Sequence, residues 1–137
     1  MWWVYALFSA FFASLTAIFA KIGVTNVNSN LATAIRTVII LLIAWGIVFF
    51  RGEYKLWASI SRTNLIFLVV SGLTTGLSWI FYFKALQLGK VSQVAPVDKL
   101  SVALTIVLSV IFLGEALNWK IALGALLIIS GTIVLIV

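Results

Sequence analysis

Five long apolar segments, separated only by short polar breaks, make up almost the whole chain. A helix needs about 20 apolar residues to cross a bilayer core about 30 Å thick, and each segment is close to that length. Lipid cannot satisfy unpaired backbone groups, and no segment alternates with the period of two that barrel strands require. The segments cover residues 2–20, 31–50, 65–83, 91–113 and 119–137. The pattern predicts an all-α membrane protein with five transmembrane helices in a single domain over residues 1–137.

The polar breaks predict the loops. Residues 23–30 are rich in turn-forming types, and Asn30 is expected to cap the second helix. The longest break, residues 51–64, carries aromatic side chains suited to the level of the lipid headgroups. Residues 84–90 and 114–120 are expected to form short turns.

Composition supports an embedded protein and excludes several functions. With 64% hydrophobic and 9% charged residues, the chain has too little polar surface to coat a soluble domain. The absence of Cys and His removes disulfides, thiol chemistry and the usual metal ligands, so we expect no metal site and no cofactor. The net charge of +6 comes from basic residues scattered at helix ends, which indicates interfacial anchoring rather than binding to nucleic acid. No pair of carboxylates suited to acid–base catalysis is present, so an enzyme is not expected.

The basic residues show no bias between the two sides of the membrane. One side receives Arg51, Lys55, Arg62 and Lys120, and the other receives Lys21, Lys84 and Lys90, with Arg36 and Lys99 near their helix entrances. Proteins with one orientation usually carry an excess of Lys and Arg on the cytoplasmic side. The balance fits either a weakly biased protein oriented by its first helix or a dual topology, with copies inserted both ways.

Ionisable residues in the spans are costly and therefore indicate a cavity or a pathway. Lys21, Arg36, Asp98 and Lys99 qualify by position, although Lys21 and Arg36 are also placed to snorkel to the interface. Pro96 is expected to bend or begin the fourth helix. Because adjacent helical residues point about 100° apart, Asp98 is expected to pair with Arg36 or Lys21 rather than with Lys99.

Polar residues on the third and fourth helices suggest where the cavity lies. The expected lining residues are Ser71, Thr75, Ser78, Ser101, Thr105 and Ser109. With Trp79 and Tyr82 beside them, two such stripes facing each other would form a polar, partly aromatic cavity. Ser and Thr also form hydrogen bonds between packed helices, which is the structural alternative. The candidate substrate-binding residues are Lys21, Arg36, Trp79, Tyr82, Asp98 and Lys99, and their mixed signs leave the charge of the substrate open.

Small residues predict where helices approach closely. An alanine stripe runs along the first helix, and Gly72 and Gly76 have GxxxG spacing on the third. Gly124 and Gly131 lie seven residues apart on the uncharged last helix, which we expect to form a dimer contact.

Several of these elements together resemble the EamA-type domain of the drug/metabolite transporter superfamily. The matching sequences are YFKAL at residues 82–86, LGE at 113–115 and GALLIISG at 124–131. AIFAKIG at residues 17–23 and the arginine of ATAIRT, Arg36, fit the first two helices of that domain. The resemblance covers essentially the full chain.

The resemblance implies a transporter of small metabolites or drug-like molecules in the cell membrane. Most family members are built from two five-span domains, the second inverted relative to the first. This chain resembles one half, which implies an antiparallel homodimer surrounded by membrane lipids. Two departures matter: Val102 lies near the place where the family often has a proline, and residues 2–20 lack the acidic residue of the related small multidrug resistance proteins. A subunit that pairs with another half-transporter and a lipid-handling protein are the alternatives.

Overall fold

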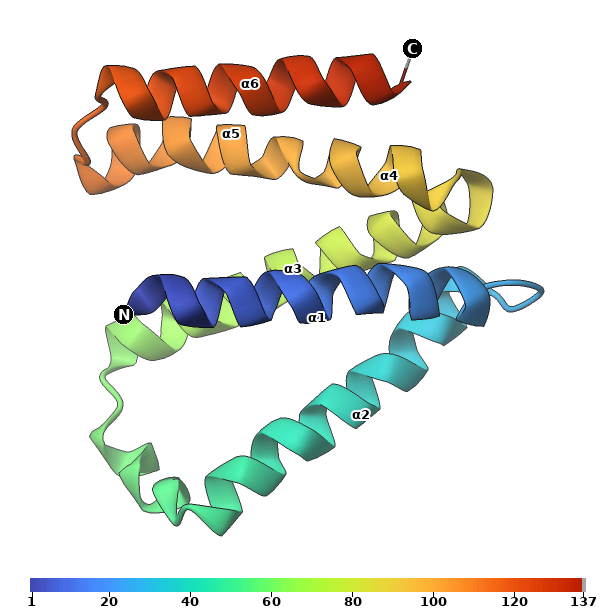
Figure 1. The fold of residues 1–137 in the computed structure, drawn as a ribbon. Helices are drawn as coiled ribbons and strands as arrows, with labels where there is room; N and C mark the ends of the chain where they lie inside the picture. The colour runs from blue at the N-terminus through green and yellow to red at the C-terminus, as the bar shows by residue number, and fades with distance from the viewer. Residues whose placement is uncertain (137) are drawn as a thin grey trace. The chain divides into compact units, whose positions relative to one another are not determined.

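The computed structural model describes residues 1–136 and consists of helices joined by short loops (Figure 1). The elements are α1 (Trp2–Gly23), α2 (Ser29–Phe50), the 3-10 helix η1 (Glu53–Ser59), α3 (Arg62–Leu88), α4 (Val91–Asp98), α5 (Leu100–Leu108), the π-helical turn η2 (Ser109–Leu113) and α6 (Trp119–Ile136). Five stretches are long and apolar enough to cross a membrane: α1, α2, α3, the run from α4 through η2, and α6. The expectation of an all-α protein with five spans is confirmed. Residue 137, which ends the last expected span, lies outside the described residues.

Helix ends differ from expectation where polar residues continue a helix. α3 runs from Arg62 to Leu88, so most of the expected turn at residues 84–90 is its last turn. Lys, Ala, Leu and Gln have high helix propensity, which explains why the helix continues past the apolar segment. α1 likewise extends to Gly23 rather than ending at residue 20. The break at residues 51–64 contains η1, whose Trp57 ring lies 6.2 Å from that of Trp45 at the end of α2.

Asn28, not Asn30, caps the second helix. The Asn28 side-chain oxygen accepts hydrogen bonds from the backbone N–H groups of Asn30 and Leu31, at 2.9 and 3.3 Å. Asn26 adopts a left-handed conformation, with φ of 62°, so the chain turns early enough for α2 to begin at Ser29. The expectation for Asn30 is wrong because this turn ends two residues sooner than the apolar pattern indicates.

The fourth span bends, as Pro96 predicts. Proline has no N–H to donate to the carbonyl one turn earlier, and the helix is interrupted at Lys99, between α4 and α5. The span then ends in the π-helical turn η2, followed by Gly114 with φ of 67°. A π-helical turn is often found at functional sites. The fourth span is therefore the least regular of the five.

The contacts of the chain divide it into two compact units. The central unit is Phe19–Gln87, and the terminal unit joins Met1–Ile18 to the residues from Leu88 on. In the terminal unit, α6 packs along α4 and α5. Thr132 of α6 is buried, and its hydroxyl lies 3.3 Å from the carbonyl oxygen of Pro96 and 2.8 Å from that of Ile128. The single-domain organisation of residues 1–137 stays a prediction.

Candidate functional site

An arginine stacked on two aromatic rings is the main feature of the central unit. The guanidinium carbon of Arg36 lies 4.6 Å from the centroid of the Trp79 ring and 4.7 Å from that of Phe83. Trp79 and Phe83 are four residues apart in α3 and therefore lie on one face of that helix. Such contacts are attractive because the negative face of each ring meets the positive charge. The structure thus brings together Arg36 and Trp79, two of the expected substrate-binding residues.

Phe83 is a member of this site that the sequence analysis missed. Its side chain is only 2% exposed, and an apolar ring in an apolar helix gives no sequence signal of its own. Its spacing of four residues from Trp79 is the sequence feature that places both rings on one face of the helix. Tyr82 is close enough to Arg36 for an electrostatic interaction, so three aromatic residues of α3 interact with this cation.

Lys21 lies at one end of the same unit and contacts the end of α3. Its ammonium donates a hydrogen bond of 2.6 Å to the carbonyl oxygen of Leu86. Cations favour the last turn of a helix, where the carbonyl groups are unpaired and the helix dipole is negative. Lys21 therefore helps to hold the end of α1 against α3, a role that sequence alone did not reveal.

Gln87 strengthens the same connection and was also missed. Its amide nitrogen donates a hydrogen bond of 2.7 Å to the carbonyl oxygen of Val27, in the loop between α1 and α2. A cavity of about 500 Å³ lies here, lined by Lys21, Val24, Thr25, Asn26 and Gln87. The last turn of α3 and the first loop thus form a polar end to the central unit.

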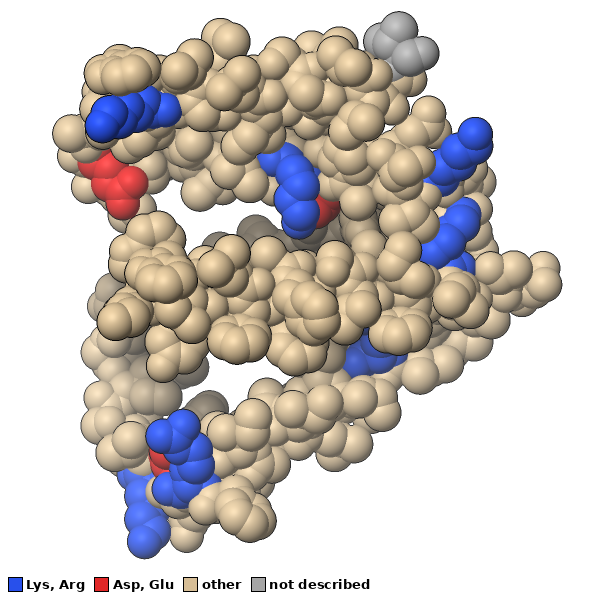
Figure 2. Space-filling model, viewed as in Figure 1, with Lys and Arg blue, Asp and Glu red and all other residues tan. Residues whose placement is uncertain are grey.

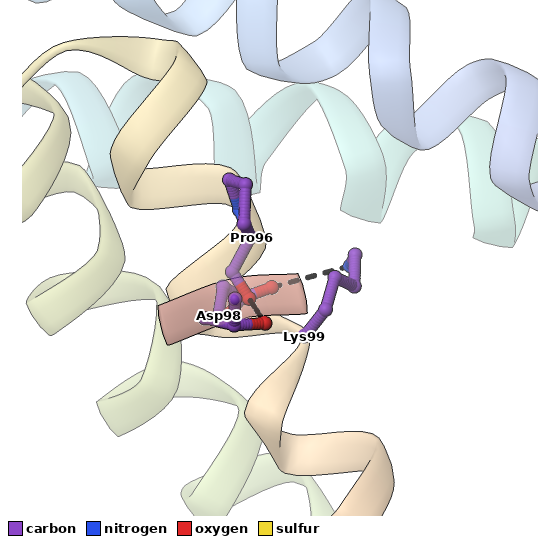
Figure 3. Close-up of polar contacts among 4 residues, drawn as sticks. Pro96, Asp98 and Lys99 are labelled. Atoms are coloured by element: carbon purple, nitrogen blue, oxygen red, sulfur yellow. Dashed lines mark hydrogen bonds and ion pairs between the residues drawn. The ribbon is translucent and has the colours of Figure 1, made fainter. Parts of the chain in front are cut away.

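Asp98 and Lys99 form an ion pair in the terminal unit, contrary to the sequence-based expectation. The Lys99 ammonium lies 3.2 Å from a carboxylate oxygen of Asp98. Figure 3 shows the lysine side chain extending back toward the aspartate, just after Pro96. The two side chains meet because the helix is interrupted at Lys99, where the long, flexible lysine side chain reaches the preceding residue. The carboxylate is half-buried, whereas the lysine is exposed.

The expected polar stripes are present on their helices, with the hydroxyl groups bonded locally. Thr75 donates to the carbonyl oxygen of Ser71 and Thr105 to that of Ser101, each at 2.8 Å. Ser109 donates to Ile106 at 3.0 Å. Such bonds to the preceding turn satisfy the donor and leave oxygen lone pairs for a ligand or another helix. Because the two stripes belong to different units, a shared cavity stays a prediction, as does the role of Ser78.

Charged side chains are few along the spans. On the face shown in Figure 2, the basic side chains form several separate small groups, and acidic side chains lie beside some of them. Glu53 is paired with Arg51 at 3.0 Å, outside the spans. Arg36 differs from the basic residues of these ion pairs because its partners within residues 1–136 are aromatic rings and not a carboxylate.

Comparison with known proteins gives these features a family. The sequence matches the EamA-like transporter family over residues 1–137. The chain belongs to this family. It is 47% identical over 136 residues to a protein of Sinorhizobium sp named "uncharacterized transporter in cobO 3'region", covering 99% of this chain and 96% of that one. An uncharacterized protein of Methanocaldococcus jannaschii is 31% identical over 83 residues, covering 61% of each chain.

No solved structure matches the chain. As an EamA-like protein with five apolar helices, the chain is a multi-pass membrane protein, and its family supports transport as its general function. The resemblance drawn from residues 82–86, 113–115 and 124–131 is therefore confirmed at the level of the family.

Glycine positions show where the helices of this EamA-like protein are open. Nothing lies within 4 Å of a Cβ placed on Gly124 or Gly131, so these positions of α6 are not filled by neighbouring atoms of the described chain. The same holds for Gly72 and Gly76 of α3, so no residue of the central unit makes the close helix contact that their spacing predicts. The dimer contact through Gly124 and Gly131 stays a prediction.

Proposed function

We propose that this protein is one subunit of a secondary active transporter that moves a small metabolite or drug-like molecule by alternating access. The observation that carries the proposal is a cation inside a span of an EamA-like protein, stacked on aromatic residues of the next span. Intramembrane ionisable residues mark substrate or ion pathways by default, because their burial is too costly to persist without a use.

The working form in this proposal is an antiparallel homodimer in the cell membrane. Five spans place the two ends of the chain on opposite sides, so a second copy inserted upside down supplies the inverted half of a complete transporter. The even distribution of Lys and Arg between the two sides supports insertion in both orientations.

Each candidate residue has a role in this scheme. Arg36, Trp79 and Tyr82 contact the substrate. Lys21 holds the end of α1 against α3. The hydroxyl stripes line the path. Asp98 couples transport to a proton or cation, with Lys99 as its partner in the resting state. The interruption after Pro96 gives the fourth span a point about which it bends.

Membrane topology is the first experiment. The chain has no native Cys, so Ser59→Cys and Ala116→Cys report one side of the membrane and Thr25→Cys reports the other. Each variant is labelled with an impermeant thiol reagent on intact cells. Labelling of about half the molecules at all three positions supports the antiparallel homodimer. Full labelling on one side with none on the other overturns it and favours a subunit that pairs with a different half-transporter.

Asp98→Asn tests the coupling role. Transport is first detected in proteoliposomes with a panel of radiolabelled small metabolites and drug-like ions, and two modes are then compared for any compound moved. We expect the variant to lose accumulation driven by a pH gradient while exchange without a gradient persists. Glu115→Gln, which removes a carboxylate outside the spans, is the matched control. Unchanged gradient-driven accumulation in Asp98→Asn eliminates Asp98 as the coupling site.

An apolar pocket at the end of α2 favours lipid handling as the second candidate function. The pocket measures about 360 Å³ and is lined by Ala44, Trp45, Val48, Glu53, Tyr54, Leu56, Trp57, Ser59 and Ile60. Its aromatic residues are suited to the membrane interface, where an acyl chain could enter. Movement of fluorescent phosphatidylcholine between the leaflets of protein-containing vesicles, reduced in Trp57→Ser, would support this function over solute transport.

A further inference from the structure

The guanidinium of Arg36 has no acceptor for its N–H groups among residues 1–136. Its contacts are the ring faces of Trp79 and Phe83 and the electrostatic interaction with Tyr82, and it takes part in neither of the two ion pairs. Stacking covers the faces of the planar group, whereas its donors lie in its plane and point outward from the edge. A group of this kind is preorganised to receive a planar or tetrahedral oxyanion through two parallel hydrogen bonds.

Two of the three acidic residues of the chain are already paired with a neighbouring basic residue. Glu53 is the only acidic residue of the central unit, and it is paired with Arg51 beyond the far end of α2. Fourteen residues of helix separate Arg36 from that end, which is about 21 Å at 1.5 Å per residue. Asp98 is neutralised by Lys99 within the terminal unit, and Glu115 lies in the loop after η2. No ion pair joins Arg36 to a carboxylate within the described residues 1–136.

Snorkelling, the structural alternative for Arg36, does not account for its position. Gln87 forms a hydrogen bond to Val27, so the end of α3 lies beside the start of α2. The distance of a residue from this shared end can therefore be counted along either helix. Arg36 is about 10 Å into α2, and the two rings are about 8 and 14 Å from the end of α3. The guanidinium therefore lies at the same distance from this end of the helices as the Arg36 backbone, instead of extending toward the interface.

We infer that Arg36, stacked on Trp79 and Phe83, is the binding site for the oxyanion of an organic anion, a carboxylate or a phosphate joined to a flat apolar body. The guanidinium edge binds the oxygens, and the exposed parts of Trp79 and Tyr82 contact the apolar body, whereas the buried Phe83 supports the guanidinium from behind. Lys21, at the same end of the central unit, adds positive charge near the polar cavity. This inference rests on the proposed transport function and fixes the sign of charge that the sequence left open.

Binding of four small probes that share one ring tests the inference. The protein is purified into phosphatidylcholine nanodiscs, and its thermal unfolding is followed with benzoate, phenyl phosphate, benzamide and benzylamine at matched concentrations. We expect benzoate, phenyl phosphate or both to raise the melting temperature, and the neutral and cationic probes to leave it unchanged. No response to either anion, or an equal response to benzamide or benzylamine, overturns the inference.

Variants assign the response to Arg36. Arg36→Gln should abolish anion binding, and Arg36→Lys should weaken it at least tenfold, because an ammonium lacks the flat two-pronged edge. Lys84→Gln is the matched control, since this exposed cation lies on the same helix as the two rings and donates a hydrogen bond to Gln87 rather than stacking on either ring. Should Arg36→Gln fail to fold, Arg36→Lys keeps the charge and still decides the outcome. Anion binding that is unchanged in Arg36→Lys rejects this site.

Two further experiments identify the source of the oxyanion and distinguish failure of this inference from failure of the proposed function. The unfolding measurements with benzoate are repeated in phosphatidylglycerol nanodiscs. If the natural ligand is a lipid phosphate, this lipid should compete with benzoate, and if it is a soluble anion, the effect of benzoate should be unchanged. Transport of a cationic compound without anion binding overturns this inference and leaves the transporter intact. Anion binding without flux of any compound in proteoliposomes overturns the transporter instead.

Discussion

A single arginine in an apolar helix must recover its lost hydration from its neighbours, and Arg36 does so with aromatic faces. The same principle applies to Lys21, whose ammonium binds a carbonyl group at the end of α3. Individual polar side chains therefore connect helices in this protein by satisfying backbone groups or charges that lipid cannot satisfy.

Asn28 provides a test of this view at the start of α2. Asn28→Ala removes the oxygen that accepts from two backbone N–H groups, so the free energy of unfolding should fall by about 1 kcal/mol. The matched control is Asn30→Ala, because Asn30 takes part in the cap only through its backbone. Thermal unfolding in detergent, followed by intrinsic fluorescence, measures both variants. A larger effect for Asn30→Ala would contradict the assignment of the cap.

Among the elements, the fourth span is the one whose regularity is broken. Pro96 interrupts it, the ion pair of Asp98 and Lys99 follows at once, and the span ends in a π-helical turn. α6 packs along the broken segment, and Thr132 approaches the carbonyl oxygen of Pro96. The bend thus has a specific polar contact from the neighbouring helix.

Thr132→Val should show how much that contact stabilises the bend. The substitution keeps the shape of the side chain but removes the hydroxyl shared between Pro96 and Ile128. Hydrogen bonds between transmembrane helices contribute roughly 0.6 kcal/mol on average, so we expect a loss of about that size in unfolding free energy. Thr105→Val, whose hydroxyl bonds only within its own helix, should have a smaller effect. Equal losses would show that the contact with Pro96 contributes nothing.

The open face of α6 at Gly124 and Gly131 is expected to form a dimer contact. Gly124→Leu combined with Gly131→Leu adds bulk where no atom of the described chain lies within 4 Å, so the fold of the monomer should be unaffected. If two copies meet there, the population in detergent should shift from dimer to monomer in light-scattering measurements. Gly46→Leu, at another open position, is the control. A dimer population unchanged by the double substitution would rule out this interface.

For the whole molecule, the balance of basic residues matters more than any single contact. Orientation in the membrane follows the excess of Lys and Arg in the short loops of one side. In this chain the two sides carry nearly equal numbers of these residues. A small number of added charges should therefore decide its orientation.

Two matched pairs of lysines test this control of topology. Ser59→Lys with Ala116→Lys should fix one orientation, and Thr25→Lys with Ser92→Lys the other, as judged by thiol labelling at a third position. Each fixed form alone should lose transport activity, because it cannot build an antiparallel pair. Expressing the two forms together should restore activity. Full activity of one fixed form by itself would contradict the antiparallel homodimer.

The sequence by itself determined the class of the protein and the course of its chain. Apolar segments of membrane-spanning length leave no alternative to helices in lipid, so five spans follow from local pattern alone. The bend at Pro96 follows equally, since proline lacks the donor that a helix requires. The motifs at residues 82–86, 113–115 and 124–131 indicated the family for the same reason: they are local features of sequence.

Only the tertiary structure decided which polar groups meet. Phe83 reads as an ordinary core residue, yet its ring contacts Arg36 of the neighbouring helix. Gln87 reads as a loop residue, yet it bonds to Val27 because α3 continues to Leu88 and reaches the first loop. The pairing of Asp98 with Lys99 depends on the break in the helix, which the average geometry of a regular helix concealed. Periodicity describes one helix at a time, whereas a site is formed by side chains whose distances depend on how helices pack.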